Sequence, residues 1–261
     1  MALSCLGIPD SMAPAPARRH KTFGELPGRR RQDASDLVDL SRMRKTDAQL
    51  RAELVKSGRA LFDKGFCPAT SGNISVRLDS HRILITPTGV SKGDMKPEDM
   101  AVISPEGQHR FGRKNASSEK QMHLLIYKLR PDVHAVVHAH PPKATAFACA
   151  GIALDQPIAS EFSQALGSVP LAKYGTPGTP DLAAALAYLV PNHSAILMGN
   201  HGVVTYGPDL FDAHGKMELV EHFAEIVQGT LLAGRQALLP PEELKRLNEA
   251  ALRYRAGMQK P

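Results

Sequence analysis

The sequence predicts an α/β fold of helix and strand layers (α+β layers) on an antiparallel or mixed sheet, in preference to a doubly wound parallel fold. Short strand-like runs joined by turns come early in the body of the chain, before strands and helices alternate strictly. Segments with apolar residues at helical spacing precede and follow this cluster. Sequential short strands of this kind usually pair as hairpins, which makes neighbouring strands antiparallel.

Hydrophobic spacing and turn residues place each element along the chain. The first helix is expected to end at Gly65 and the second at Pro131, while Thr179 and Pro180 are residue types that begin a later helix. The expected helices lie at about 46–65, 118–130, 142–150, 180–189, 209–234 and 241–256. The expected strands, several of them rich in β-branched residues, lie at 73–78, 82–87, 100–105, 133–140, about 168–173, 194–200 and 203–207.

The basic charge of the chain is concentrated in its first part. The 261 residues carry a formal net charge of +6, and residues 1–45 contain nine basic and five acidic side chains. The rest is therefore nearly balanced. Aromatic residues make up 5%, with no tryptophan, and none alternate with basic residues as a stacking platform for bases would require. We expect no nucleic-acid partner.

Composition also predicts the domain organisation and the compartment. Residues 1–45 are rich in Pro, Arg and Ser, so we expect a flexible basic N-terminal extension followed by one domain over 46–261. Three scattered cysteines (Cys5, Cys67 and Cys149) fit a reducing compartment, and Cys67 and Cys149 are expected to be core residues. We find no apolar stretch of spanning length and no signal-peptide pattern, so we expect a cytoplasmic protein without a membrane partner.

Histidines at strand ends are the strongest chemical signal. His138 and His140 are two residues apart in a predicted strand, so both side chains project from the same face. His201 follows another predicted strand, between Asn200 and Gly202. Such imidazoles could bind a metal such as zinc, or could be ordinary polar residues of an exposed strand and a turn.

The candidate acid is Glu119, in the first turn of the predicted second helix. A glutamate there is favoured by capping and by the helix dipole, so a purely structural role stays open. The preceding Ser117 and Ser118, together with free N–H groups of the helix terminus, could instead bind an anion. Glu119 would then point to a metal.

Two further segments carry small hydrogen-bond donors around a glycine. Residues 70–75 (TSGNIS) precede a predicted strand, and residues 86–91 (TPTGVS) follow one. Each alone is typical of a turn. Together with the two serines they form the set of donors that a phosphorylated small molecule needs.

Six motifs in order resemble the class II aldolase/adducin family, most closely its fuculose-phosphate aldolase branch. The motifs are TSGNISVR, ITPTGVSKGDM, SSE, RPDVHAVVHAHP, YGTPGT and MGNHGVVTYG, and they span about residues 46–235. The resemblance implies a three-layer α/β/α sandwich around a mostly antiparallel central sheet. It also implies a homotetramer with active sites between subunits.

The resemblance assigns roles residue by residue. Three metal-binding histidines of the family match His138, His140 and His201, and its catalytic glutamate, which also ligates zinc in the empty site, matches Glu119. The implied cofactor is Zn²⁺, with another divalent metal as the alternative. The phosphate-binding positions of the family match Asn73, Thr88, Gly89, Ser117 and Ser118.

The implied function is that of a zinc-dependent aldehyde-lyase. It would cleave a small ketose phosphate reversibly to dihydroxyacetone phosphate and an aldehyde, in carbohydrate metabolism such as pentose catabolism. A decarboxylase or dehydratase of sugar phosphates on the same site is the alternative, and a non-catalytic adducin-like interaction protein is disfavoured by the three histidines. Ribulose-phosphate 4-epimerases of the family have Asp where Glu119 stands.

One feature departs from the aldolase branch. That branch has a proton-donating tyrosine about twenty residues after the histidine pair, and residues 156–162 contain none here. Tyr174 lies later. Tyr254 lies in the last predicted helix, where relatives often carry another active-site tyrosine, and it is the remaining candidate.

Overall fold

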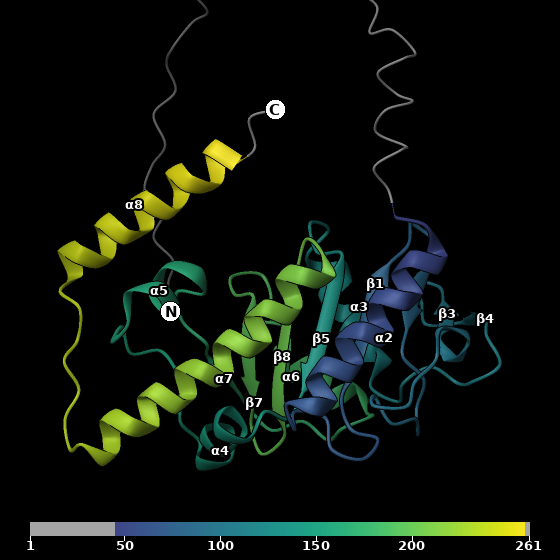
Figure 1. Cartoon of the computed structure of the whole chain (residues 1–261), viewed down its shortest axis with the longest axis horizontal. Helices are drawn as coiled ribbons and strands as arrows, with labels where there is room; N and C mark the ends of the chain where they lie inside the picture. The colour runs from purple at the N-terminus through teal and green to yellow at the C-terminus, as the bar shows by residue number, and fades with distance from the viewer. Residues whose placement is uncertain (1–44, 259–261) are drawn as a thin grey trace, which may run out of the picture. The chain divides into compact units, whose positions relative to one another are not determined.

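The computed structural model describes residues 45–258 (Figure 1). Residues 1–44 lie outside this description, so the flexible basic extension stays a prediction. Within the last helix, the side chains of Asn248 and of residues 251–258 are also outside it, including that of Tyr254. No helix in the described part is long and apolar enough to cross a membrane.

The described residues form an eight-stranded sheet in the order β4-β3-β2-β1-β5-β8-β7-β6. Neighbouring strands are antiparallel except β6 and β7, which are parallel. This confirms the mostly antiparallel sheet. The strands are β1 (Asn73–Arg77), β2 (Ile83–Ile85), β3 (Ala101–Ile103), β4 (His109–Phe111), β5 (Ala135–Ala139), β6 (Leu171–Ala172), β7 (Ala195–Met198) and β8 (Gly202–Gly207).

Helices cover both faces of the sheet, which confirms the three-layer sandwich. Alternate residues of β5 enter different cores: Ala135 and Val137 pack into one, and Val136 into the other. The first core is completed by α2 (Asp47–Asp63), α4 (Pro142–Ala150), α5 (Ser160–Ala165) and α7 (Leu210–Leu232). The second is completed by α3 (Lys120–Leu129) and α6 (Pro180–Leu186). In Figure 1, α2 and α7 lie in front of the sheet.

Helix ends follow the local chemistry of the sequence. Gly65 follows α2 with φ +74°, a conformation that glycine adopts without strain, as predicted. Thr179 accepts a hydrogen bond from the Asp181 N–H and Pro180 opens α6, also as predicted. Thr46 begins α2 through a capping box with Gln49, which the sequence analysis did not identify.

Several elements differ from the sequence predictions. The exposed strand β4 and the short helix α5 were not predicted, because neither has a clear apolar period or a side-chain cap. The expected strand at 168–173 is reduced to β6. A short 3-10 helix, η1 (Pro97–Asp99), and α8 (Pro241–Met258) complete the described chain. Cys67 is buried as expected, but the core prediction for Cys149 is wrong because it lies on an exposed face of α4.

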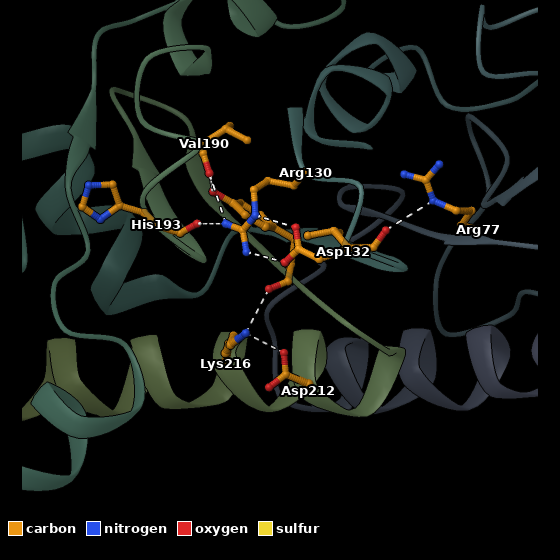
Figure 2. A network of polar contacts seen from close by, with 9 residues as sticks. Arg77, Arg130, Asp132, Val190, His193, Asp212 and Lys216 are labelled. Atoms are coloured by element: carbon orange, nitrogen blue, oxygen red, sulfur yellow. Dashed lines mark hydrogen bonds and ion pairs between the residues drawn. The ribbon is translucent and has the colours of Figure 1, made fainter. Parts of the chain in front are cut away.

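Polar side chains join the layers at one end of the central strands (Figure 2). Arg130 donates to both carboxylate oxygens of Asp132 and to the backbone oxygens of Val190 and His193. From the other helical layer, Lys216 donates to the backbone oxygen of Tyr206 on β8. Because Ala135 pairs with Gly207 at this end of β5 and β8, the network stabilises the end of the sheet opposite His138.

We predict that Arg130→Ala lowers the free energy of unfolding by about 1–3 kcal/mol, because two carbonyl acceptors and Asp132 lose a charged donor. Urea denaturation of the purified chain measures this change. Arg113→Ala is the matched control, since Arg113 is exposed and has no hydrogen bond or ion pair with another residue of 45–258. Equal unfolding midpoints for the two variants would contradict this prediction.

Candidate active site

Three histidines converge at the end of the sheet opposite the Arg130 network. His138 lies in β5, His140 follows that strand directly, and His201 lies in the turn between β7 and β8. One ring nitrogen from each lies within 4.8 Å of the others. His138 is buried, while His140 and His201 are half-buried. A small ligand therefore has access to the cluster from one side.

Backbone geometry brings these three side chains together. In the antiparallel pairing of β5 and β8, His138 stands opposite Val204, so the turn before β8 lies beside the end of β5. Asn200 adopts a left-handed conformation (φ +54°) in that turn. A Cβ atom at Gly202 would lie 2.5 Å from His140 Cδ2 and 2.7 Å from the Ala139 oxygen. Only glycine allows β8 to lie this close to the histidines.

The hydrogen bonds of His138 fix where its free electron pair points. Its Nδ1 lies 2.9 Å from the Val203 backbone oxygen, an acceptor, so Nδ1 carries a proton. Nε2 of the neutral ring is then unprotonated. It lies 3.2 Å from His140 Nε2 and 3.2 Å from Glu119 Oε2. Unshared electron pairs facing each other at such distances need a proton or a cation between them.

The spacing of these donor atoms suits a tetrahedral metal ion. Ligand bonds of about 2.0–2.1 Å place the ligand atoms of a tetrahedral site about 3.3–3.4 Å apart. The separations of 3.2 Å around His138 Nε2, and of 3.2 Å between His201 Nε2 and Glu119 Oε1, are close to that value. Glu119 Oε1 is buried without a hydrogen-bond partner among the described residues. The residues therefore fit a divalent cation.

Glu119 lies immediately before α3 rather than in its first turn, which corrects the sequence prediction. Its side chain makes no capping hydrogen bond, so the capping role that the sequence left open is not seen. The carboxylate instead faces His138 and His201 and accepts a hydrogen bond of 2.7 Å from Asn73 Nδ2. Burial opposes ionisation, but positive charge on the facing His138 and His201 would outweigh it and hold the pKa of Glu119 well below its usual value.

The three predicted anion-binding segments also meet beside this cluster. Thr86 exchanges hydrogen bonds with Ile74 at the start of β1, and its backbone oxygen accepts from the Ser117 N–H. The Thr88 N–H donates to the Asn115 oxygen. These contacts hold residues 86–88 between β1 and the segment that leads into α3.

The predicted phosphate residues differ in their accessibility. Thr88, Gly89 and Ser118 are exposed, and the N–H groups of Gly89 and Ser118 donate to no acceptor within residues 45–258. Ser117 is buried, and its hydroxyl accepts from the Glu119 N–H. Asn73 is buried too and directs its amide to Glu119. Thr88, Gly89 and Ser118 are thus open to a ligand, whereas Ser117 and Asn73 already have partners.

Lys92 is a residue of this region that sequence reasoning missed. Its side chain is only 1% exposed, and its ammonium group donates to the backbone oxygens of Thr70 and Val90. Burial lowers its pKa, and the neighbouring Cys67 opposes that effect. The contacts tie the two glycine-containing segments together. A single lysine within a turn-rich segment carries no periodic signal, which is why the sequence did not reveal it.

His123 is buried on α3 between Asn73 and Ser75. Burial lowers its pKa to about 3. His134, by contrast, is exposed and lies beyond the opposite end of β5. Ser75 and Tyr127, which extend the contacts of His123, were not identified from the sequence.

Known proteins with similar sequences and structures share this arrangement of the chain. Residues 52–228 match the class II aldolase and adducin N-terminal domain. A 3-oxo-tetronate 4-phosphate decarboxylase of Haemophilus influenzae is 35% identical over 69% of this chain and 88% of its own length. A 5-deoxy-D-ribulose 1-phosphate aldolase of Bacillus thuringiensis is 33% identical over 76% and 92%.

A solved structure of an L-fuculose 1-phosphate aldolase superposes with a TM-score of 0.72 and 33% identity, over 80% of this chain and 98% of that one. The family match covers more than half of the chain, and the relatives are matched over most of their lengths. Sequence motifs, sheet topology and structural similarity therefore agree. The chain belongs to the class II aldolase and adducin family.

Proposed function

We propose that this chain is a zinc-dependent aldehyde-lyase that cleaves a small ketose phosphate reversibly to dihydroxyacetone phosphate and an aldehyde. The observation that carries the proposal is the cluster of His138, His140, His201 and Glu119 beside two segments with unused N–H donors, at Gly89 and at Ser118. Relatives named as aldolases of sugar phosphates support it. The metal and the phosphate would then bind adjacent parts of one substrate.

Zinc is the proposed metal because three imidazoles and one carboxylate are typical ligands of a catalytic zinc site. When bound, zinc would act as a Lewis acid on the substrate oxygens. The hydrogen bond from His138 Nδ1 to the Val203 oxygen would hold the ring in its orientation. Metal-binding histidines usually have such a second hydrogen-bond partner. Metal analysis of the purified chain tests the choice: about one zinc per chain supports it, and no metal supports an adducin-like role.

Glu119 would move the proton that the reaction requires. Breaking a carbon–carbon bond beside a carbonyl leaves an electron pair, and the carbon that keeps it must receive a proton. Glu119 Oε1 has no hydrogen-bond partner among the described residues, while Oε2 is held by Asn73. In cleavage, the hydroxyl next to the breaking bond loses its proton as it becomes the aldehyde carbonyl. We infer that Oε1, which starts as a carboxylate, receives a proton released in this step and passes it to that carbon.

The substrate phosphate would bind at the start of α3. The exposed hydroxyls of Thr88 and Ser118 and the N–H groups of Gly89 and Ser118 lie where the positive end of the helix dipole favours an anion. A Cβ atom added at Gly178 would lie 3.8 Å from Ser118 Cβ, so the segment before α6 borders the same position. Ser117 would act mainly by shaping the turn, and Asn73 would retain one amide hydrogen for the ligand.

Decarboxylation of a sugar-acid phosphate is the second candidate, and one feature favours it. In the segment where the aldolase branch has its tyrosine, Phe162 is buried and stacks on Phe223. Tyr174 and Tyr188 are exposed, while Tyr127 and Tyr206 are buried. Decarboxylation releases carbon dioxide instead of an aldehyde, so it does not need the residue that exchanges a proton with the aldehyde oxygen. A relative named 3-oxo-tetronate 4-phosphate decarboxylase supports this alternative.

A paired assay tests the proposal. The zinc-loaded chain is incubated with a panel of ketose 1-phosphates while dihydroxyacetone phosphate is detected, and separately with 3-oxo-tetronate 4-phosphate while carbon dioxide is detected. Release of dihydroxyacetone phosphate supports the aldolase. Release of carbon dioxide alone replaces it with the decarboxylase.

We also propose that the chain works as a cytoplasmic homotetramer, with active sites between subunits. Large apolar side chains on α7 support an association surface: Phe211 is 87% exposed and Leu232 is 84% exposed. A partner subunit could supply the aldehyde-side proton donor, for which Tyr254 is the candidate.

We predict that His138→Ala, His140→Ala and His201→Ala each remove most of the bound zinc and nearly all turnover, because only two histidines would hold the ion while Glu119 acts on the substrate. Inductively coupled plasma mass spectrometry on the purified variants gives the metal content. His81→Ala is the matched control, as His81 is exposed and distant in sequence from the cluster. Stoichiometric zinc in two of the three variants would show that the ligand set is wrong.

We predict that the neighbours Ser118 and Glu119 affect different kinetic constants. Ser118→Ala should raise KM about 10- to 150-fold, with a smaller effect on kcat, because a phosphate contact exists in the ground state and the transition state alike. Glu119→Gln keeps the shape but not the base, so kcat should fall about 10²- to 10⁴-fold. Steady-state kinetics on the best substrate measures both, and a near-normal kcat for Glu119→Gln would refute the proposed proton transfer.

A further inference from the structure

A continuous chain of hydrogen bonds runs from Glu119 into the core between β1 and α3. Asn73 Nδ2 lies 2.7 Å from Glu119 Oε2, and Asn73 Oδ1 lies 2.5 Å from His123 Nε2. His123 Nδ1 lies 2.7 Å from Ser75 Oγ, which lies 2.8 Å from the Tyr127 hydroxyl. Four side chains thus connect the proposed catalytic carboxylate to the interior.

The regular residue spacing of an α-helix and of a β-strand aligns these residues. Glu119, His123 and Tyr127 are four residues apart along one side of α3, and Asn73 and Ser75 are two apart on the facing side of β1. His123 and Ser75 have no exposed surface, and Asn73 has 4%. At the inner end, Arg77 stacks 4.7 Å over the Tyr127 ring and donates to the Tyr127 backbone oxygen. Water therefore does not compete for these bonds.

Donor and acceptor accounting gives the chain a single direction. An ionised Glu119 only accepts, so Asn73 must present its NH₂ to Glu119 and its oxygen to His123. His123 must then donate from Nε2. A neutral ring leaves Nδ1 to accept from Ser75, whose oxygen accepts from Tyr127.

Complete burial without a carboxylate in contact keeps His123 neutral, and burial accordingly lowers its pKa to about 3. Every hydrogen bond therefore points toward Glu119.

We propose that His123, Ser75 and Tyr127 are positioning residues that hold the Asn73 amide in one orientation and thereby fix the Glu119 carboxylate beside the three histidines. The proposal rests on the proposed function for its kinetic and zinc-affinity consequences, whereas the His123 tautomer is independent of both. If His123 carried its proton on Nδ1, its Nε2 would accept, and the Asn73 amide would turn its oxygen toward Glu119. Two oxygen acceptors would then face each other, and Glu119 would lose both its donor and its fixed position.

The expected loss of zinc affinity and activity is the one generally found for residues that hydrogen-bond to metal ligands. Loss of a group that orients a ligand costs about 10- to 100-fold in metal affinity or activity. A role in stability alone would lower the unfolding midpoint of the protein without selectively weakening zinc or kcat. Three measurements therefore distinguish a positioning role from a packing role: zinc affinity, the separate changes in KM and kcat, and the tautomer of His123.

The test compares two polar substitutions of His123. His123→Gln places an N–H donor near the Nε2 position and keeps the bond to Asn73, whereas His123→Asn places polar atoms near the Nδ1 position and loses it. We expect zinc affinity, measured by chelator competition, to fall about 10- to 100-fold in His123→Asn and to be largely retained in His123→Gln. On the best sugar phosphate, kcat should follow the same order while KM changes little.

Thr205→Val is the matched control for loss of a buried hydrogen bond. Thr205 is fully buried on β8 and donates to the Ala213 oxygen on α7, on the opposite face of the sheet. It should lower thermal stability and leave zinc affinity unchanged. Tyr127→Phe, which removes only the far donor, should have a smaller effect on zinc affinity than Ser75→Ala, which lets His123 change its tautomer.

Nitrogen-15 NMR of the metal-free chain gives a readout that needs no activity. We expect His123, assigned by its loss in His123→Gln, to carry its proton on Nε2. A proton on Nδ1, or wild-type zinc affinity in a folded His123→Asn, would overturn the proposal. If no sugar phosphate is cleaved by the wild-type chain, the proposed reaction is refuted, while the zinc affinities and the His123 tautomer still decide the positioning role.

Discussion

The convergence of unshared electron pairs at one end of the sheet is the constraint on which the rest of the structure depends. His138 Nε2 faces His140 and Glu119 at hydrogen-bond distances, although its only ring proton is already directed to the Val203 oxygen. Such a cluster is unfavourable without a positive charge at its centre. The β5 and β8 register and the lack of a side chain at Gly202 bring the histidines this close together.

One set of stabilising contacts lies at the end of the sheet away from that cluster. The Arg130 network and the Lys216 contact lie at the other end of β5 and β8, where strands and both helical layers meet. Between the two ends, apolar residues fill both cores. This division lets the histidine end be arranged for binding rather than for packing, as strained or electrostatically unfavourable sites generally require support from the surrounding fold.

The sequence predicted elements with strong local signals and missed those defined by tertiary contacts. Periodic helices, Gly65 and the Thr179 cap were predictable because residues a few positions apart determine them. The strand β4 and helix α5 carry no such period. Among site residues, histidines at strand ends were identifiable as a group, whereas Lys92 acts through the Thr70 and Val90 oxygens and could not be. The sequence could not show that the Glu119 carboxylate faces His138 and His201, because this depends on the direction of its side chain.

Asn73 links the two halves of the site, and this follows from its hydrogen-bond capacity. An amide group has two N–H bonds and one oxygen. The oxygen is taken by His123 and one hydrogen by Glu119, so one hydrogen remains for a ligand bound beside Thr88 and Gly89. A phosphate oxygen that accepted it would hold the amide in the orientation that the buried chain already imposes. In the proposed function, substrate binding and the placement of the carboxylate would thus favour the same conformer, and neither would have to reorganise the other before the reaction.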